Sequence, residues 1–216
     1  MPHGLSKSPN FVIIKNRSNA YGWAVLHTSA GLTGTTVDSQ AEYYMMRLNT
    51  NDDRDNWSQD TIWGPTTTTI KIDQNGGASW VNKSGSSYVA YIWHNVDGFQ
   101  RFGKYTANGN ADGPFVYTGF KPKIVLVKAL TRNEHWNMPI FSNEGGTING
   151  VVKSFSTNLS TSQRDMDDNP AWTVYSNGFK IKTDDANMNY SSSEYVYCAW
   201  AESPLNNLYG GSANAR

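Results

Sequence analysis

The sequence has little charge, one cysteine and no long apolar run. Charged residues make up 17% of its 216 residues, against about 25% in a typical globular domain. Eighteen Lys and Arg balance eighteen Asp and Glu, so we expect neither nucleic acid nor an anionic membrane as a partner. The single Cys198 excludes an intrachain disulfide, and its apolar neighbours predict a buried, unreactive thiol.

The apolar runs are too short for a membrane. The longest, Phe11–Ile14 and Ile124–Val127, are far below the roughly 18 residues that a spanning helix needs. The first nine residues also lack the apolar stretch of about 7–15 residues that a secretory signal requires. We therefore predict no membrane insertion and no secretory signal.

Aromatic residues are abundant instead, with eight Trp and twelve Tyr, and they gather in short segments between turn residues. These segments are rich in β-branched and aromatic residues or alternate with a period of two, which is typical of strands. No segment shows helical periodicity over three turns. The sequence predicts an all-β antiparallel β-sandwich or jelly roll, with strands at 11–15, 43–48, 70–72, 88–94, 179–182 and 195–201.

Two segments near the start of each half of the chain match. Pro9–Lys15 aligns with Pro122–Lys128, and Trp23 aligns with Trp136, at one constant offset in the numbering. The continuous apolarity of both segments predicts a central strand that is covered on both faces. Repeated landmarks without a gap indicate an internal repeat.

Two later landmarks recur in the same order. Asn82–Trp93 aligns with Asn189–Trp200 at a slightly smaller offset, and an acidic loop in Asn51–Trp57 recurs in Asp165–Trp172. The change of offset places the length difference in loops, where it costs little. We therefore predict two tandem, pseudo-symmetric repeats.

The predicted domains are a first repeat at 1–97, a β-strand connector at 98–120, a second repeat at 121–204 and a C-terminal tail at 205–216. The connector holds six aromatic residues, more than a flexible linker needs, and is interpreted as two strands joined by a turn around Asn108–Pro114. We expect the repeats to pack as one body.

Several longer motifs carry a resemblance. They are Pro9–Ser18 with Trp23, the central Gly103–Phe120, Ser176–Lys180 and Tyr195–Pro204. Together they resemble a module of unknown function in the virion proteins of tailed phages, often marine phages. The resemblance spans nearly the whole chain, and the central motif is its most specific part.

The resemblance implies a non-enzymatic structural module on the virion surface that serves assembly with other virion proteins and host-surface attachment. The module would be a capsid decoration, head fibre, spike or tail-fibre module. A self-contained protein would suit a capsid decoration or head fibre, and a piece of a longer chain would suit the tip of a tail fibre. Aromatic edges at Tyr105 and Phe115–Tyr117 favour a symmetric homo-oligomer, with a trimer preferred. The competing class is a free-standing, lectin-like carbohydrate-binding protein.

Four tryptophans are the candidate binding residues for a glycan or a partner protein, because exposed rings beside polar groups are typical of sugar-binding surfaces. They are Trp57, Trp63, Trp80 and Trp172. The alternative is that these rings fill the ends of the sandwich or an oligomer interface.

The two acidic loops supply oxygen ligands at the close spacing that Ca²⁺ prefers. The candidate ligands are Asp52, Asp53 and Asp55, and Asp165, Asp167 and Asp168. The alternative is a pair of solvated turns whose side chains cap their own backbone. We expect no other cofactor.

Catalytic signatures are missing from the sequence. No histidine pair has metal-ligand spacing, and no serine lies in a Gly-x-Ser-x-Gly turn. A glycosidase needs only two carboxylates, but Glu42, Glu134, Glu144, Glu194 and Glu202 are scattered and do not match between the repeats. We predict no catalytic residue.

Overall fold

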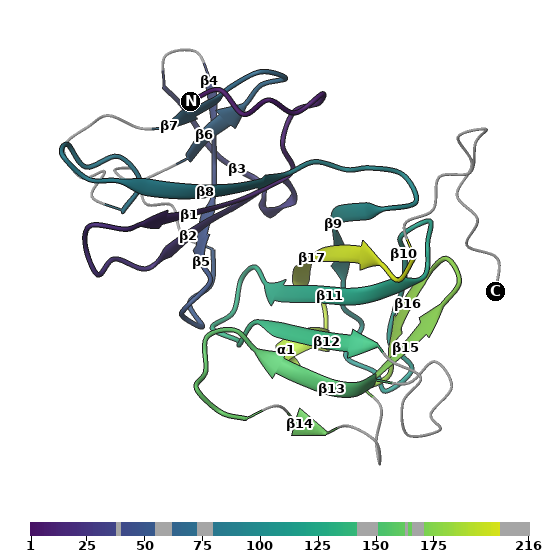
Figure 1. The fold of residues 1–216 in the computed structure, drawn as a ribbon. Helices are drawn as coiled ribbons and strands as arrows, with labels where there is room; N and C mark the ends of the chain where they lie inside the picture. Colours follow the sequence, from purple (N-terminus) through teal and green to yellow (C-terminus); the bar gives the residue numbers. More distant parts are fainter. Residues whose placement is uncertain are drawn as a thin grey trace. The chain divides into compact units, whose positions relative to one another are not determined.

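A computed structural model describes residues 1–37, 40–54, 62–72, 80–141, 151–162, 164–165 and 171–203. The fold is all-β with antiparallel pairing, as predicted (Figure 1). The chain divides into two compact units, Met1–His94 and Asn95–Arg216, and each is treated by itself. Within the described ranges, no helix has the length and apolarity that crossing a membrane requires.

The first unit contains two four-stranded sheets, with the orders β5-β2-β1-β8 and β3-β4-β6-β7. A 3-10 turn at Thr28–Ala30 follows β2. The strands are β1 (Phe11–Asn16), β2 (Trp23–His27), β3 (Leu32–Val37), β4 (Gln40–Tyr43), β5 (Met45–Arg47), β6 (Ile62–Pro65), β7 (Ile70–Ile72) and β8 (Tyr88–Trp93).

The core of the first unit lies between these sheets. Val12 and Ile14 of β1 contact Leu26 of β2 and Ile70 of β7 within one buried cluster. Alternate residues of a strand point to opposite faces, and Phe11, on the other face of β1, is also buried. The prediction of a central strand covered on both faces is confirmed, since β1 lies between β2 and β8 and successive residues from Phe11 to Ile14 are buried.

The segment predicted as one strand at 43–48 is two strands in different sheets. β4 ends at Tyr43 and pairs with β3 and β6, whereas β5 begins at Met45 and pairs with β2. The chain crosses between the layers at Tyr44. The single-strand prediction was wrong because an aromatic and apolar run does not reveal a change of sheet.

The second unit contains a six-stranded sheet, β14-β13-β12-β11-β17-β9, and a three-stranded sheet, β10-β16-β15. A short helix, α1 (Ala186–Asn189), begins after Asp185, whose side chain accepts a hydrogen bond from the Asn187 backbone N–H. The strands are β9 (Gln100–Thr106), β10 (Phe115–Tyr117), β11 (Pro122–Ala129), β12 (Asn137–Phe141), β13 (Val151–Ser156), β14 (Arg164–Asp165), β15 (Trp172–Tyr175), β16 (Gly178–Ile181) and β17 (Glu194–Ala201).

The two sheets of the second unit enclose its core. Trp172 and Phe179 of the small sheet share one buried cluster with Val125 and Val127 of β11 and Tyr195 of β17. The rings of Tyr105 and Tyr195 stack with their centroids 5.2 Å apart. Burial raises the pKa of both tyrosines, so their hydroxyls stay protonated and donate to backbone carbonyls.

The pairing register of β1 with β2 and β8 in the first unit matches that of β11 with β12 and β17 in the second. Phe11 faces His27 and Trp93, and Ile124 faces Ile140 and Trp200. β1 and β2 are related to β11 and β12 by the same offset that aligns Pro9 with Pro122. β8 is related to β17 by the smaller offset that aligns Trp93 with Trp200. Sequence and pairing therefore agree over three strands of each unit, and a repeat of the whole unit stays a prediction.

The predicted connector contributes strands to the second unit. β9 pairs with β17, and β10 pairs with β16, so both strands join sheets made of residues after 94. The two strands lie in different sheets because the loop between them crosses from one layer of the sandwich to the other.

Candidate functional site

The small sheet of the second unit has one buried and one exposed face. Val116 of β10, Phe179 of β16 and Trp172 of β15 point into the core. The intervening residues point outward, and three of them are large rings: Phe115 is 46% exposed, Tyr117 58% and Tyr175 42%. We call these three rings the aromatic face.

Strand register brings the three rings together although Tyr175 lies far from Phe115 and Tyr117 in the sequence. Phe115 faces Lys180, and Tyr117 faces Gly178, which in turn faces Tyr175. The rings of Phe115 and Tyr175 meet edge to face, with centroids 5.7 Å apart and planes at 76°.

Gly178 leaves room for the Phe115 ring to lie over β16. A Cβ atom at this position would lie 2.2 Å from the Val116 carbonyl oxygen and 2.8 Å from Cζ of Phe115. Both distances are too short for real contacts, so only glycine lets Phe115 lie over the middle strand.

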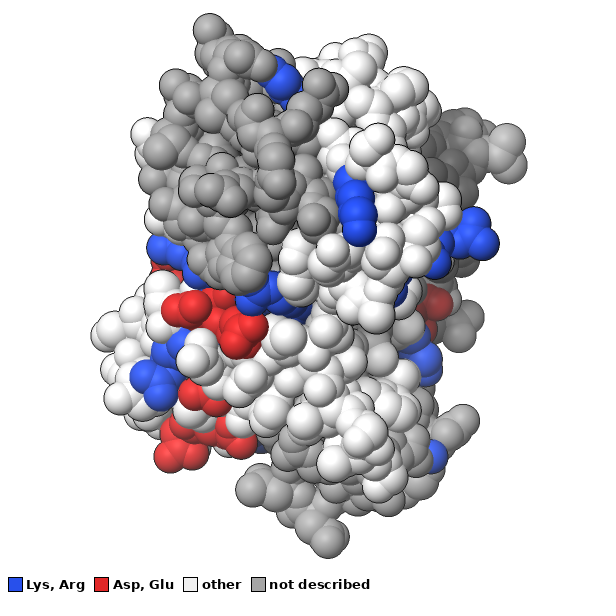
Figure 2. All heavy atoms as spheres, turned by 90° about the vertical axis from the view of Figure 1, so that its left-hand side faces the viewer, with Lys and Arg blue, Asp and Glu red and all other residues white. Residues whose placement is uncertain are grey.

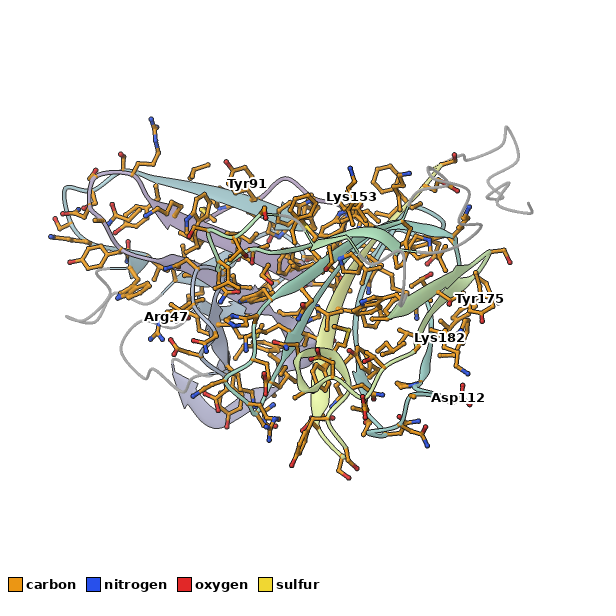
Figure 3. All side chains as sticks on the ribbon, turned by 90° about the horizontal axis from the view of Figure 1, so that it is seen from below. Arg47, Tyr91, Asp112, Lys153, Tyr175 and Lys182 are labelled. Atoms are coloured by element: carbon orange, nitrogen blue, oxygen red, sulfur yellow. The ribbon has the colours of Figure 1, made fainter. Side chains whose placement is uncertain are left out.

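Charged groups border the aromatic face. The Lys180 ammonium lies 2.5 Å from Oδ1 of Asp112. The hydrogen bond from Lys180 lowers the pKa of the Asp112 carboxyl, and the same bond raises the pKa of Lys180. The Arg101 guanidinium lies 6.0 Å from the centre of the Tyr117 ring, and Figure 3 shows Asp112, Lys182 and Tyr175 at the same end of the second unit.

A buried asparagine fixes the loop that carries Asp112. The Nδ2 atom of Asn189 lies 2.7 Å from the Thr183 carbonyl oxygen, 2.8 Å from that of Asn110 and 3.1 Å from Oδ1 of Asn108. Its Oδ1 accepts from the Asn108 backbone N–H. These bonds hold the loop between β9 and β10 against the short helix α1.

This arrangement provides flat apolar surfaces with hydrogen-bonding groups beside them. Sugars bind to such surfaces through their C–H faces while their hydroxyls bond to the polar rim. Three neighbouring exposed rings on one sheet face exceed the single exposed hydrophobic residues that are normal on a protein surface. The aromatic face therefore has the properties of a binding surface.

A family model for a domain of unknown function, DUF7483, matches residues 1–204. The chain belongs to this family. No curated protein and no solved structure matches the chain.

The tryptophans predicted as binding residues of this DUF7483 chain fall in different environments. Trp57 lies outside the described residues, and Trp63 lies in β6, where its backbone faces Glu42 and Lys71. Trp80 is half-buried, with its ring 5.1 Å from the guanidinium carbon of Arg47.

Trp172 is completely buried, which contradicts its expected role as an exposed contact. It lies on the core face of β15, where its ring contacts Phe179 with the centroids 5.6 Å apart. The physical reason is strand alternation, because Trp172 and Val174 point inward together while Tyr175 points outward.

In the described part of the acidic loops, one of the candidate calcium ligands forms an ion pair. Asp52 accepts a hydrogen bond from Arg47 at 2.9 Å, and Asp53 is half-buried. Asp165 lies in β14, and Asp55, Asp167 and Asp168 lie outside the described residues. Among the residues that the structure describes, no group of three or more His, Cys, Asp or Glu could hold a metal ion.

Three of the glutamates weighed as glycosidase carboxylates form ion pairs with basic side chains. Glu134 pairs with Arg132, Glu194 with Lys104 at 2.6 Å, and Glu202 with Lys121 at 2.8 Å. On the face in Figure 2, uncharged residues cover most of the described surface. The low charge content of the sequence is thus visible on the folded protein.

Proposed function

We propose that this DUF7483 chain is a non-enzymatic phage virion structural module, displayed on the virion surface as a capsid decoration, head fibre, spike or tail-fibre module. The virion setting rests on the sequence resemblance. The aromatic face carries the proposal of attachment, because a displayed module needs an exposed contact surface and these rings form one.

The proposed ligand of the aromatic face is a host-surface glycan. Phe115 and Tyr175 present perpendicular rings, so a sugar can lie flat on one and be bordered by the other. Lys180 and Asp112 supply a donor and an acceptor beside the rings. A virion protein attached to its host through such a face binds weakly at each copy, and many copies on one particle raise the overall affinity.

A binding assay on glycans of the host surface tests this proposal. Replacing Tyr175 or Phe115 by Ser removes a ring at a cost of about 1 kcal/mol, so we expect roughly five- to tenfold weaker binding for each. Tyr190→Ser is the matched control, since Tyr190 is also exposed but lies at the end of α1. Equal losses in all three variants, or no binding by the unmodified chain, would reject a glycan-binding role.

The second candidate is a free-standing lectin-like protein, which the same aromatic face favours. Mass spectrometry of purified phage particles separates the two, because a virion module copurifies with the particle and a free lectin does not. Incubation with host polysaccharide tests the absence of catalysis. Sustained release of reducing ends that disappears in Glu194→Gln or Glu202→Gln would show an enzyme.

A further inference from the structure

β8 forms one edge of its sheet in the first unit. It follows β1 in the order β5-β2-β1-β8, and no described strand pairs with its other side. The Arg17 backbone N–H donates to the Ser87 carbonyl, which makes Arg17 and Ser87 a hydrogen-bonded pair. In an antiparallel ladder such pairs alternate, so the backbone groups of Val89 and Tyr91 face β1. Those of Ala90 and Ile92 face outward.

The corresponding edge in the second unit is covered by a strand. At the offset that aligns Trp93 with Trp200, Ala90 and Ile92 correspond to Tyr197 and Ala199 of β17. These residues face Gly103 and Arg101 of β9. In the second unit, the edge equivalent to that of β8 is therefore already paired with an antiparallel strand.

The two terminal strands differ in charge. β9, the last strand of its sheet, carries Arg101 and Lys104 among its seven residues. β8 has the sequence YVAYIW, without charge, proline or glycine. Charged residues and proline are the usual means by which an edge strand avoids pairing with another chain, and β8 has neither.

We propose that β8 pairs antiparallel with β8 of a second copy of this chain. With the two-fold axis at Tyr91, Ala90 of each copy faces Ile92 of the other, and their outward N–H and C=O groups form four hydrogen bonds. Tyr91 faces its own counterpart as a non-hydrogen-bonded pair, in which side chains approach closely. Tyr91 is 46% exposed in the single chain.

The sequence of β8 favours a second copy over an unrelated strand. An edge on a two-fold axis presents identical donors and acceptors to itself, so one surface supplies both halves of the interface. An uncharged strand can approach its copy without repulsion. The pairing joins the four-stranded sheets of two copies into one continuous sheet. This proposal does not depend on the glycan-binding role of the aromatic face.

Sedimentation equilibrium of the full chain over a range of concentrations, together with hydrogen exchange of single amides, tests the pairing. We expect a monomer–dimer equilibrium in which protection of the Ala90 and Ile92 amides increases with concentration. A chain that stays monomeric throughout would overturn the proposal. Protection that is the same in the monomer and in the dimer would also overturn it, because the edge would then be covered within one chain. So would an oligomer, a trimer included, in which both amides exchange freely.

Two variants of β8 complete the test. Tyr91→Lys places like charges opposite each other on the axis and should raise the dimer dissociation constant at least about tenfold. Ala90→Pro removes an N–H that β1 does not use, and proline is tolerated on such an edge, so the unit should fold while the dimer is lost. Tyr190→Lys is the control for added charge. A dimer that neither β8 variant weakens would refute pairing through β8.

Discussion

Replacing Asn189 by Ala should destabilise the second unit more than any other single change of a polar side chain near the aromatic face. Asn189 is completely buried, and its amide bridges the Thr183 and Asn110 carbonyls and both the side chain and the backbone of Asn108. Alanine leaves all of these groups without their partner. The loop that carries Asp112 would lose its attachment to α1.

The magnitude follows from where those groups lie. Each buried polar group that loses its partner costs about 1–3 kcal/mol. Asn108 and Asn110 are exposed, so water can replace part of their bonding, whereas Thr183 is half-buried. We therefore expect a loss of about 2–4 kcal/mol in the free energy of unfolding, equivalent to a fall of roughly 5–15 °C in Tm for a chain of this size.

Asn189→Asp sharpens the test because it keeps the shape and the acceptor for the Asn108 N–H but removes both donors. Its carboxylate would face two carbonyl oxygens, so the loss should be at least as large as for alanine. Asn110→Ala is the control, since the Asn110 side chain accepts one exposed bond from Asp112 and should cost less than about 1 kcal/mol. Chemical denaturation of the full chain measures all three. A loss under about 1 kcal/mol for both Asn189 variants would refute the reasoning.

Three further predictions concern the same unit. Gly178→Ala should destabilise it by about 1–3 kcal/mol, since the added methyl group collides with the Val116 carbonyl; urea denaturation should show a lower midpoint. The Asp112 carboxyl should titrate by NMR below the ordinary pKa of aspartate, because the hydrogen bond and charge of Lys180 hold that pKa down, and Lys180→Met should raise it. The Asp112–Lys180 ion pair makes a small contribution to the free energy of unfolding. This contribution is present above the pKa that Asp112 has in the unfolded chain, and it is lost as the pH falls through the pKa of Asp112 in the folded protein. Burial raises the pKa of the Cys198 thiol, so a thiol reagent should modify it only after denaturation; rapid reaction of the native protein would contradict this.

Four of the strands could be predicted from the sequence because their signal is local. β1, β8, β11 and β17 are dense in aromatic and β-branched residues, and alternation with turn residues gives their limits. The repeat alignment also relates β1 to β11 and β8 to β17. The burial of Cys198 follows from the same apolar run and is confirmed.

The site could not be predicted in the same way because it depends on distant pairing. Phe115 and Tyr175 alternate with buried residues in their own strands, which is a signal for two half-exposed strands. Their contact depends on β16 lying between β10 and β15. Trp172 was predicted to be exposed because it lies beside polar residues in loop-like sequence, but its inward direction is set by the pairing of β15 in the small sheet.

β17 lies between β11 and β9, so the large sheet of the second unit is complete only when residues 194–201 have been made. A ribosome releases the strands of the first unit, all before residue 94, well before that point. Until then, among the described strands, β9 has no strand partner and β11 is paired only with β12, so both strands present unpaired backbone groups of the kind that promotes aggregation. The charges of β9 therefore protect the unfinished protein as well as the finished one.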